Sequence, residues 1–553
     1  MASLRDAHLP RWRTDFATIA RDVGSLLAME AALMAASVLV AAVFREWYVA
    51  LAFVLSSVLT AAVGLSSRRA FATAPNPRMK HGMIIAASGW LMTAVFGSLP
   101  FFLSALLVPP DVVASYVPAG ASYAQSSLAY FSNPLHAFFE SMSGWTGSGL
   151  TMAVHEPSLP RGIQWWRSLI QWVGGVGVIV LTVSILARPG SGSYALYRSE
   201  AREEKIHPSI VSTVRTVWKI FLAYTVLSIL ALFVAIRLSG YGSTLPLWEA
   251  GWQAINHAMT GLSTGGFSVT DNSIATYDSP LIEFVLLPVM TLGAIAFPIH
   301  YAVLRDRDVD LFRSDVQTRW LLILLFVGVL ALSVQNIVSI PATQGAFEGT
   351  KAWLGLDAVL GPIVADAARD STFQWISALT CTGFQSAPIR QWADGGKLLV
   401  SGAMVLGGTA GSTVGGIKII RGYVISRGIQ WQFRRVFLPA SAVVGTRLNG
   451  RRVNREEMER EFSEAAIVTL LWLLVLAASS LVLVNLVGPS YGYADVLFEV
   501  ASAQGNVGLS TGITGPSMHP VAEAMFLLNM WVGRLEIIPV LVFARSLLYG
   551  LDP

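Results

Sequence analysis

Four glycine-bearing segments recur along the chain, and their residue types suit the binding of an alkali cation. Glycine permits backbone conformations that other residues avoid, and a ring of backbone carbonyls replaces the hydration shell of such an ion. The segments read FESMSGWTGSG (139–149), INHAMTGLSTG (255–265), FQWISALTCTG (373–383) and FEVASAQGNVG (498–508). Their last glycines, spaced by 116, 118 and 125 residues, are Gly149, Gly265, Gly383 and Gly508.

The rest of the chain predicts membrane-spanning helices. Of 553 residues, 54% are hydrophobic and 13% are charged, about half the roughly 25% charge of a soluble domain. This composition excludes a soluble protein and a disordered chain. About 20 apolar residues cross a bilayer as a helix, and the segments of that length are 24–44, 48–65, 82–107, 163–187, 212–238, 279–303, 317–340, 396–420, 463–487 and 521–547.

The glycine-bearing segments fall between these spans, in four stretches too short to cross the membrane. They lie near 134–148, 248–264, 368–382 and 494–507. Their length suits re-entrant half-helices, whose partially negative C-terminal ends favour a cation where they converge. We therefore predict an all-α polytopic membrane protein with ten transmembrane helices, in which four helix–half-helix–helix repeats surround a central pore. The predicted parts are a two-helix extension at 1–81 and repeats at 82–211, 212–316, 317–462 and 463–553.

Basic residues give the predicted topology. Residues 66–81 contain four basic residues and no acid, and residues 421–464 contain nine arginines against five glutamates. An excess of Lys and Arg marks cytoplasmic loops, so both loops and both termini are predicted to be cytoplasmic. The net charge of +4 has the same origin, and it requires no nucleic-acid partner.

The pore segments resemble the filter loops of the TrkH/TrkG, KtrB and HKT superfamily of potassium transporters. The resemblance rests on GWTGSGLT, GLSTGGFS, LTCTGFQS and AQGNVGLST, and on WWRSLIQWVGGVGVIVL (165–181), GGTAGSTVGGIKIIR (407–421) and WVGRLEIIPVLVF (531–543), which are similar to the second helices of its repeats. The two extra N-terminal spans are similar to the TrkH type. The resemblance implies a potassium uptake protein of the cell inner membrane, with K+ bound by backbone carbonyls.

The filter residues that this resemblance implies come from all four loops. They are Thr146, Gly147, Ser148, Gly149, Ser263, Thr264, Gly265, Cys381, Thr382, Gly383, Asn506, Val507 and Gly508. The implied carbonyl ligands of K+ are those of Ser148, Gly149, Thr264, Gly265, Thr382, Gly383, Val507 and Gly508. In the first loop, either Gly147 or Gly149 is the filter glycine.

A second glycine-rich run lies at 407–416, where it is expected to break a helix at membrane depth. By resemblance it is a gate below the filter, and the alternative is a hinge without a gating role. Its residues are Gly407, Gly408, Gly411, Ser412, Thr413, Gly415 and Gly416. Arg534 is a charge within the last span and therefore a functional candidate. By resemblance it is the pore arginine that repels cations, and the alternative is a local ion pair with Glu536 or another buried acid.

Other charged residues are expected to have structural roles. Glu140 and Glu499 are predicted to cap the N-termini of the first and fourth half-helices. Lys418 and Arg421 are expected to extend to the cytoplasmic interface, and Glu30 is expected near the same face. Cys381 is the only cysteine, which excludes an intrachain disulfide.

The partners are expected from the same resemblance. It implies a homodimer in the lipid bilayer that binds a ring of TrkA/KtrA-like nucleotide-binding regulatory subunits at loops 188–211, 304–316 and 421–462. No organic cofactor is expected, because the glycine run at 411–416 lacks the GK[ST] of a P-loop. An ion-coupled symporter that uses Na+ or H+ remains the alternative function. An enzyme is disfavoured, since the spans offer few converging acids or histidines.

Overall fold

The computed structural model describes residues 11–186, 210–343, 345–349, 355, 357–437, 439, 446–448 and 451–551. The predicted docking loop 188–211 lies almost entirely outside the described residues. In the described part almost all regular structure is helical, and the strands are β1 (Thr446–Leu448) and β2 (Arg451–Val453), which form an antiparallel hairpin. The predicted all-α class is confirmed.

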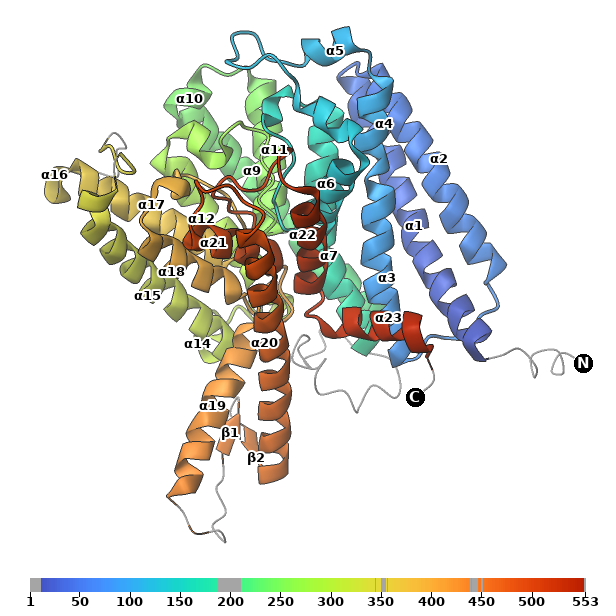
Figure 1. The fold of residues 1–553 in the computed structure, drawn as a ribbon, viewed down its shortest axis with the longest axis vertical. Coiled ribbons are helices and arrows are strands. Elements are labelled where there is room, and N and C mark those ends of the chain that lie inside the picture. Colours follow the sequence, from blue (N-terminus) through green and yellow to red (C-terminus); the bar gives the residue numbers. More distant parts are fainter. Residues whose placement is uncertain are drawn as a thin grey trace, which may run out of the picture.

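Two long N-terminal helices, α1 (Arg11–Val43) and α2 (Trp47–Ala70), pack together at one edge of the molecule (Figure 1). The remainder repeats one order of elements four times: a long helix, a short helix, a loop and a second long or broken helix. The first two such units contain α3 (Met79–Gly97), α4 (Leu99–Leu107), α5 (Pro110–Ser115), η1 (Ser127–Ser132), α6 (Pro134–Thr146), η2 (Glu156–Ser158) and α7 (Arg161–Leu186), then α9 (Ile210–Leu238), α10 (Gly240–Ser243), α11 (Leu247–Leu262), η4 (Ser273–Tyr277), α12 (Pro280–Ala294) and α13 (Phe297–Asp306).

The third and fourth units follow the same order. Where the third unit ends and the fourth begins, α19 (Ile419–Val436) and α20 (Arg455–Val484) extend together away from the helical body and carry the β hairpin (Figure 1). Their elements are α14 (Leu311–Ser314), α15 (Val316–Ser339), η5 (Ile340–Ala342), α16 (Asp357–Leu360), α17 (Pro362–Leu379), η6 (Ile389–Gln391), α18 (Asp394–Val405) and α19 (Ile419–Val436), then α20 (Arg455–Val484), α21 (Tyr493–Gly505), α22 (Pro520–Arg534) and α23 (Ile538–Tyr549).

Six helices in the described residues are long and apolar enough to cross a membrane, and two bent pairs raise that number to eight. The bent pairs are α12 with α13, at 104°, and α22 with α23, at 115°. A proline follows each break, Pro298 at the start of α13 and Pro539 at the start of α23, and a proline fits the first turn of a new helix. The other two predicted spans coincide with α7 and with α18–α19, so the count of ten stays a prediction.

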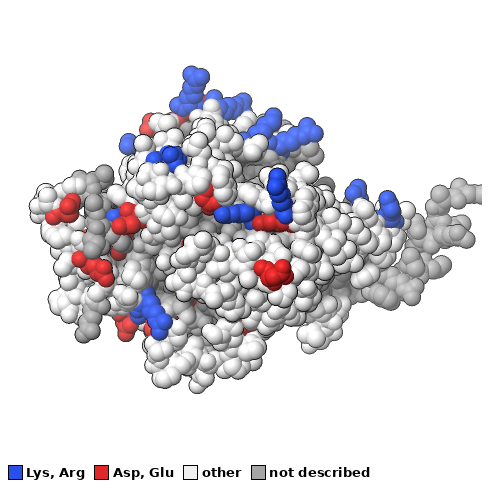
Figure 2. Space-filling view, turned by 90° about the horizontal axis from the view of Figure 1, so that it is seen from above, with Lys and Arg blue, Asp and Glu red and all other residues white. Residues whose placement is uncertain are grey.

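The surface carries few charges for its size. In the view from above, Lys, Arg, Asp and Glu are scattered, and uncharged residues make up most of the visible surface (Figure 2). Large apolar side chains such as Leu227, Leu230 and Val234 of α9 are more than half exposed. A bilayer is the solvent that suits such helices.

Candidate functional site

The four short helices α6, α11, α17 and α21 confirm the predicted half-helices. They are 13, 16, 18 and 13 residues long, and each ends at a loop with left-handed backbone. In each loop the first and third residues have positive φ: Gly147 and Gly149, Thr264 and Gly266, Cys381 and Gly383, Asn506 and Gly508. Three of the first positions hold non-glycine residues, for which this conformation is uncommon. We call these residues the pore loops: 147–149, 264–266, 381–383 and 506–508.

The backbone geometry moves the register of the second pore loop by one residue. The middle N–H of each loop donates to the carbonyl five residues earlier: Ser148 to Ser143 (2.9 Å), Gly265 to Thr260 (2.8 Å), Thr382 to Ser377 (2.9 Å) and Val507 to Ser502 (2.9 Å). Gly265 is therefore equivalent to Ser148, and Gly266 is equivalent to Gly149. The sequence alignment on Gly265 was wrong in this repeat, because a Gly–Gly pair offers two anchors and the alignment took the first. In the first loop, Gly149 shares the third position with Gly383 and Gly508.

The third-position glycines lock the loops into a closed ring. A Cβ atom on each of them would overlap, or nearly overlap, the middle carbonyl of the next loop; on Gly508 it would lie 2.6 Å from the Ser148 oxygen. The pairs are Gly149 with the Gly265 carbonyl, Gly266 with Thr382, Gly383 with Val507, and Gly508 with Ser148. Each loop thus contacts the next, and the fourth contacts the first. At these positions a side chain is excluded by a neighbouring backbone and by the positive φ.

Glycines on the second helices press against the same half-helices from outside. A Cβ on Gly174, Gly293 or Gly533 would overlap the carbonyls of Trp145, Leu262 and Gln504, respectively. These three carbonyls lie three residues before the middle residue of their loops, so the contact is equivalent in repeats one, two and four. The half-helix ends are therefore held at a fixed distance from the surrounding helices.

A polar side chain on each half-helix holds the ascending part of its own loop. The four residues are Glu140, His257, Gln374 and Glu499, each eight positions before the middle loop residue. Glu140 accepts from Met152 N (2.8 Å), His257 contacts Ser268 Oγ (3.2 Å), Gln374 contacts Ser386 Oγ (3.2 Å), and Glu499 accepts from Thr511 N (2.9 Å). The predicted capping role of Glu140 and Glu499 is wrong, because both lie in the interior of their helices; the cap of α6 is Asn133.

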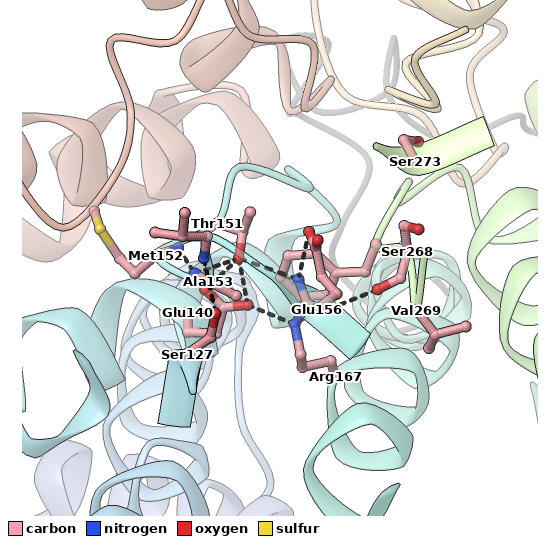
Figure 3. Close-up of polar contacts among 12 residues, drawn as sticks. Ser127, Glu140, Thr151, Met152, Ala153, Glu156, Arg167, Ser268, Val269 and Ser273 are labelled. Carbon is pink, nitrogen blue, oxygen red and sulfur yellow. Dashed lines mark hydrogen bonds and ion pairs between the residues drawn. The ribbon is translucent and has the colours of Figure 1, made fainter. Parts of the chain in front are cut away.

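Arg167 on α7 joins the segments that directly follow the first two pore loops (Figure 3). Its guanidinium donates to Glu140 Oε1 (2.6 Å), to Thr151 Oγ1 (3.1 Å) and to the Ser268 carbonyl (2.7 Å), and it lies 4.2 Å above the Phe267 ring. The side chain is 1% exposed. Sequence reasoning missed this residue, although an arginine at the fifth position of the predicted span 163–187 was a signal.

Four pairs of ionisable side chains connect each second helix to the half-helix of the next repeat. Most of these side chains are buried or nearly so. The pairs are Arg161–Glu249 (2.8 Å), Glu283–Arg369 (2.8 Å), Lys397–Asp495 (2.7 Å) and Glu523–His136 (2.9 Å). The last of them returns from the fourth repeat to the first, so the pairs form a second closed ring around the pore loops.

The glycine-rich run forms a buried segment between α18 and α19, which we call the 406–418 segment. Thr413 contacts Thr264 Oγ1 of the second pore loop (2.8 Å) and donates its N–H to the Gly293 carbonyl (3.2 Å). The Gly411 carbonyl accepts from Phe297 N (3.1 Å) at the break between α12 and α13. The predicted interruption of the helix is confirmed, and its buried contacts include the second pore loop.

Arg534 binds backbone carbonyls and not Glu536. Its guanidinium donates to Thr413 O (2.6 Å) and to Gly174 O (3.0 Å), and it lies 3.9 Å from the position of a Cβ on Gly147. Glu536 instead pairs with Arg421. The alternative of an Arg534–Glu536 pair is therefore wrong. The expected extension of Lys418 and Arg421 to the interface is also wrong, because they are 8% and 2% exposed.

These features define a multi-pass membrane protein with a ring of four re-entrant loops and a buried segment against them. The family model described as TrkH, cation transport protein, matches residues 80–549, and the chain belongs to this family. It is 32% identical over 480 residues to an uncharacterized cation transporter of Methanocaldococcus jannaschii, covering 86% of this chain and 85% of that protein. It is 28% identical to the Trk system potassium uptake protein TrkH of Escherichia coli K12, covering 95% and 98%.

A solved structure has the same fold. The crystal structure of the potassium transporter TrkH from Vibrio parahaemolyticus matches with a TM-score of 0.74 at 24% identity, covering 97% of this chain and 99% of that one.

Proposed function

We propose that the protein takes up potassium through a selectivity filter made of the four pore loops. The observation that carries this proposal is the closed ring in which the glycine of each loop abuts the carbonyl of the next. Each loop follows the C-terminal end of a half-helix, where the helix dipole favours a cation. Backbone carbonyls at such a ring are the ligands that replace water around K+. The names of the bacterial relatives support K+ as the substrate.

The proposed gate is the 406–418 segment together with Arg534. The segment is hydrogen-bonded to the second pore loop through Thr413, and Arg534 bridges it to α7. A guanidinium next to the loops opposes the entry of a cation by charge repulsion. Release of the hydrogen bonds from Arg534 to the Thr413 and Gly174 carbonyls would let both the 406–418 segment and the guanidinium move away from the pore loops.

The proposed regulatory partner docks on the projecting α19–α20 arm. This arm carries exposed basic residues, among them Arg434, Arg452, Arg455 and Arg460. By family resemblance the partner is a ring of TrkA/KtrA-like nucleotide-binding subunits, bound to a homodimer at the cytoplasmic face of the cell inner membrane. The test is co-purification of such a ring with the protein from the native membrane. Charge reversal of Arg434 and Arg455 should abolish co-purification. If the wild-type protein does not co-purify with a ring, this partner is ruled out.

The filter is tested by substituting glycines in a cell that lacks other K+ uptake. Gly383→Ser and Gly508→Ser should abolish growth at low K+ and Rb+ flux in reconstituted vesicles, because the new side chains collide with backbone. Gly402→Ser is the matched control, since a Cβ on this α18 glycine meets nothing within 4 Å. Normal, K+-selective flux in both filter variants would overturn the assignment.

A further inference from the structure

Glu30 on α1 is a buried acid without a visible partner. Its side chain is 0% exposed, and neither carboxylate oxygen has a hydrogen-bond partner. It lies beside Trp145, the penultimate residue of α6. The expected position near the cytoplasmic face is therefore wrong, and the acid sits directly behind the first pore loop.

Other polar atoms around Glu30 are equally unpaired. The Oε1 atom of Glu30, the Oγ of Ser141 and the Nε1 of Trp145 lie 2.8, 2.7 and 2.6 Å from the point that a Cβ on Gly97 would occupy. All three atoms are buried without a hydrogen-bond partner. Buried polar groups are rarely left unpaired in proteins, so such a cluster indicates a site that takes up a further atom.

The charged groups on the helices that pack against α1 either bind other residues or lie in the last turn of α2. Lys80 and His81 of α3 bind Asp15, Arg161 of α7 binds Glu249, Arg167 of α7 binds Glu140, and Arg68 and Arg69 belong to the last turn of α2. On α6, His136 binds Glu523. Within the described residues, no ion pair therefore compensates a negative charge on Glu30.

Burial of an uncompensated carboxylate costs several kcal/mol or more, and such a group takes up a proton instead. Glu499 differs from Glu30, because it is equally buried but accepts five hydrogen bonds from residues 510–514. A metal ion suits the Glu30 cluster poorly, since Trp145 presents an N–H donor and only one group carries a charge.

We propose that Glu30, with Ser141 and Trp145, forms a proton-binding site behind the first pore loop. The protonated acid donates its O–H within the cluster, and its carbonyl oxygen accepts from the Trp145 indole N–H. Loss of the proton leaves a negative charge against the end of α6, whose Trp145 carbonyl is held by Trp90 Nε1 (3.2 Å). Since Thr146 to Gly149 follow directly, the occupancy of this site controls the first pore loop.

Infrared spectroscopy of the purified full chain tests the proton itself. The wild type should show, at neutral pH, a protonated carboxylic acid band that Glu30→Gln lacks; Glu156, whose pKa burial raises to about 8, contributes a separate band that is present in both proteins. Glu46→Gln is the matched control and should keep the band, because Glu46 is also buried but accepts backbone N–H bonds from Arg161 and Gly162 (2.6 and 2.8 Å). Identical carboxylic acid bands in the wild type and Glu30→Gln would overturn the proposal, and so would a band shift that depends on Na+ and not on pH.

The effect on flux rests on the proposed potassium uptake and is measured separately. Rb+ flux into vesicles should fall several-fold between pH 6 and pH 9 in the wild type, while Glu30→Gln, which imitates the neutral acid, should keep its flux at both. Gly97→Ala should reduce flux at all pH values, because its Cβ enters the cluster. Equal pH profiles of flux in the wild type and Glu30→Gln would refute control of the first pore loop by the Glu30 proton. Absence of Rb+ flux at every pH would instead count against the uptake function and would leave the infrared result intact.

Discussion

His136 Nδ1 lies 2.9 Å from Glu523 Oε1, and this contact between the first and the last repeat closes the ring of inter-repeat pairs. The Glu523 side chain is fully buried. Asn133 Nδ2 contacts the other ring nitrogen of His136 at 3.1 Å, while its Oδ1 accepts from Leu135 N. Because the Asn133 amide is fixed as a donor, His136 Nδ1 carries the hydrogen that Glu523 accepts.

We expect His136→Ala to lower the thermal stability of the detergent-solubilised protein. The substitution leaves a buried carboxylate short of its donor, and the loss of a hydrogen bond to a charged group costs about 1.5–3 kcal/mol. The double variant His136→Ala/Glu523→Gln should recover part of the loss. The exposed pair Arg455–Glu459 serves as the control, since such surface pairs contribute about 0–1 kcal/mol, and Arg455→Ala should leave the midpoint unchanged. An equal loss in both single variants would contradict a special role for the ring.

The register of the second pore loop predicts unequal effects of two neighbouring substitutions. A Cβ on Gly266 overlaps the Thr382 carbonyl, whereas a Cβ on Gly265 meets the Gln171 side chain at 2.6 Å, and a side chain can move. Gly266→Ala should therefore reduce Rb+ flux at least tenfold more than Gly265→Ala. A larger loss of flux in Gly265→Ala than in Gly266→Ala would show that Gly265, and not Gly266, is equivalent to Gly149.

Removal of Arg167 should relax the discrimination between K+ and Na+. The guanidinium joins α6, through Glu140, to the segment that follows the second pore loop, through Ser268, and no lysine reproduces three contacts in fixed directions. We expect both Arg167→Lys and Arg167→Met to raise Na+ flux relative to K+ flux, with lower stability in Arg167→Met. Unchanged ion ratios together with reduced stability would show a role in packing alone.

Arg534→Ala should raise flux severalfold in vesicles without regulatory subunits. The variant removes both the positive charge beside Gly147 and the bonds to Thr413 and Gly174. Arg534→Gln separates the two effects, because it keeps a donor without the charge. Flux equal to the wild type in both variants would argue against a gate at this position.

The sequence predicted the half-helices well because their signal is local. A short apolar segment between spans, ending at glycine, was enough to locate α6, α11, α17 and α21 within a few residues, apart from an earlier start for α17. The register of the second loop was lost because it depends on which residues take a positive φ, and spacing alone does not distinguish Gly265 from Gly266. The long-range ion pairs could not be predicted either, because spacing along the chain does not show which side chains meet. Glu536 is two residues from Arg534, yet its partner Arg421 comes from another repeat.

The ring of glycine–carbonyl contacts also affects how the pore responds to mutation. All four loops belong to one polypeptide, so a single codon change alters one quarter of the ring, whereas in a pore of four identical chains it would alter every quarter at once. The loops have accordingly diverged at their first positions, to Gly147, Thr264, Cys381 and Asn506, while each keeps glycine at the third. Mutation can therefore change one loop of such a ring without changing the other three, and selection can act on each loop separately.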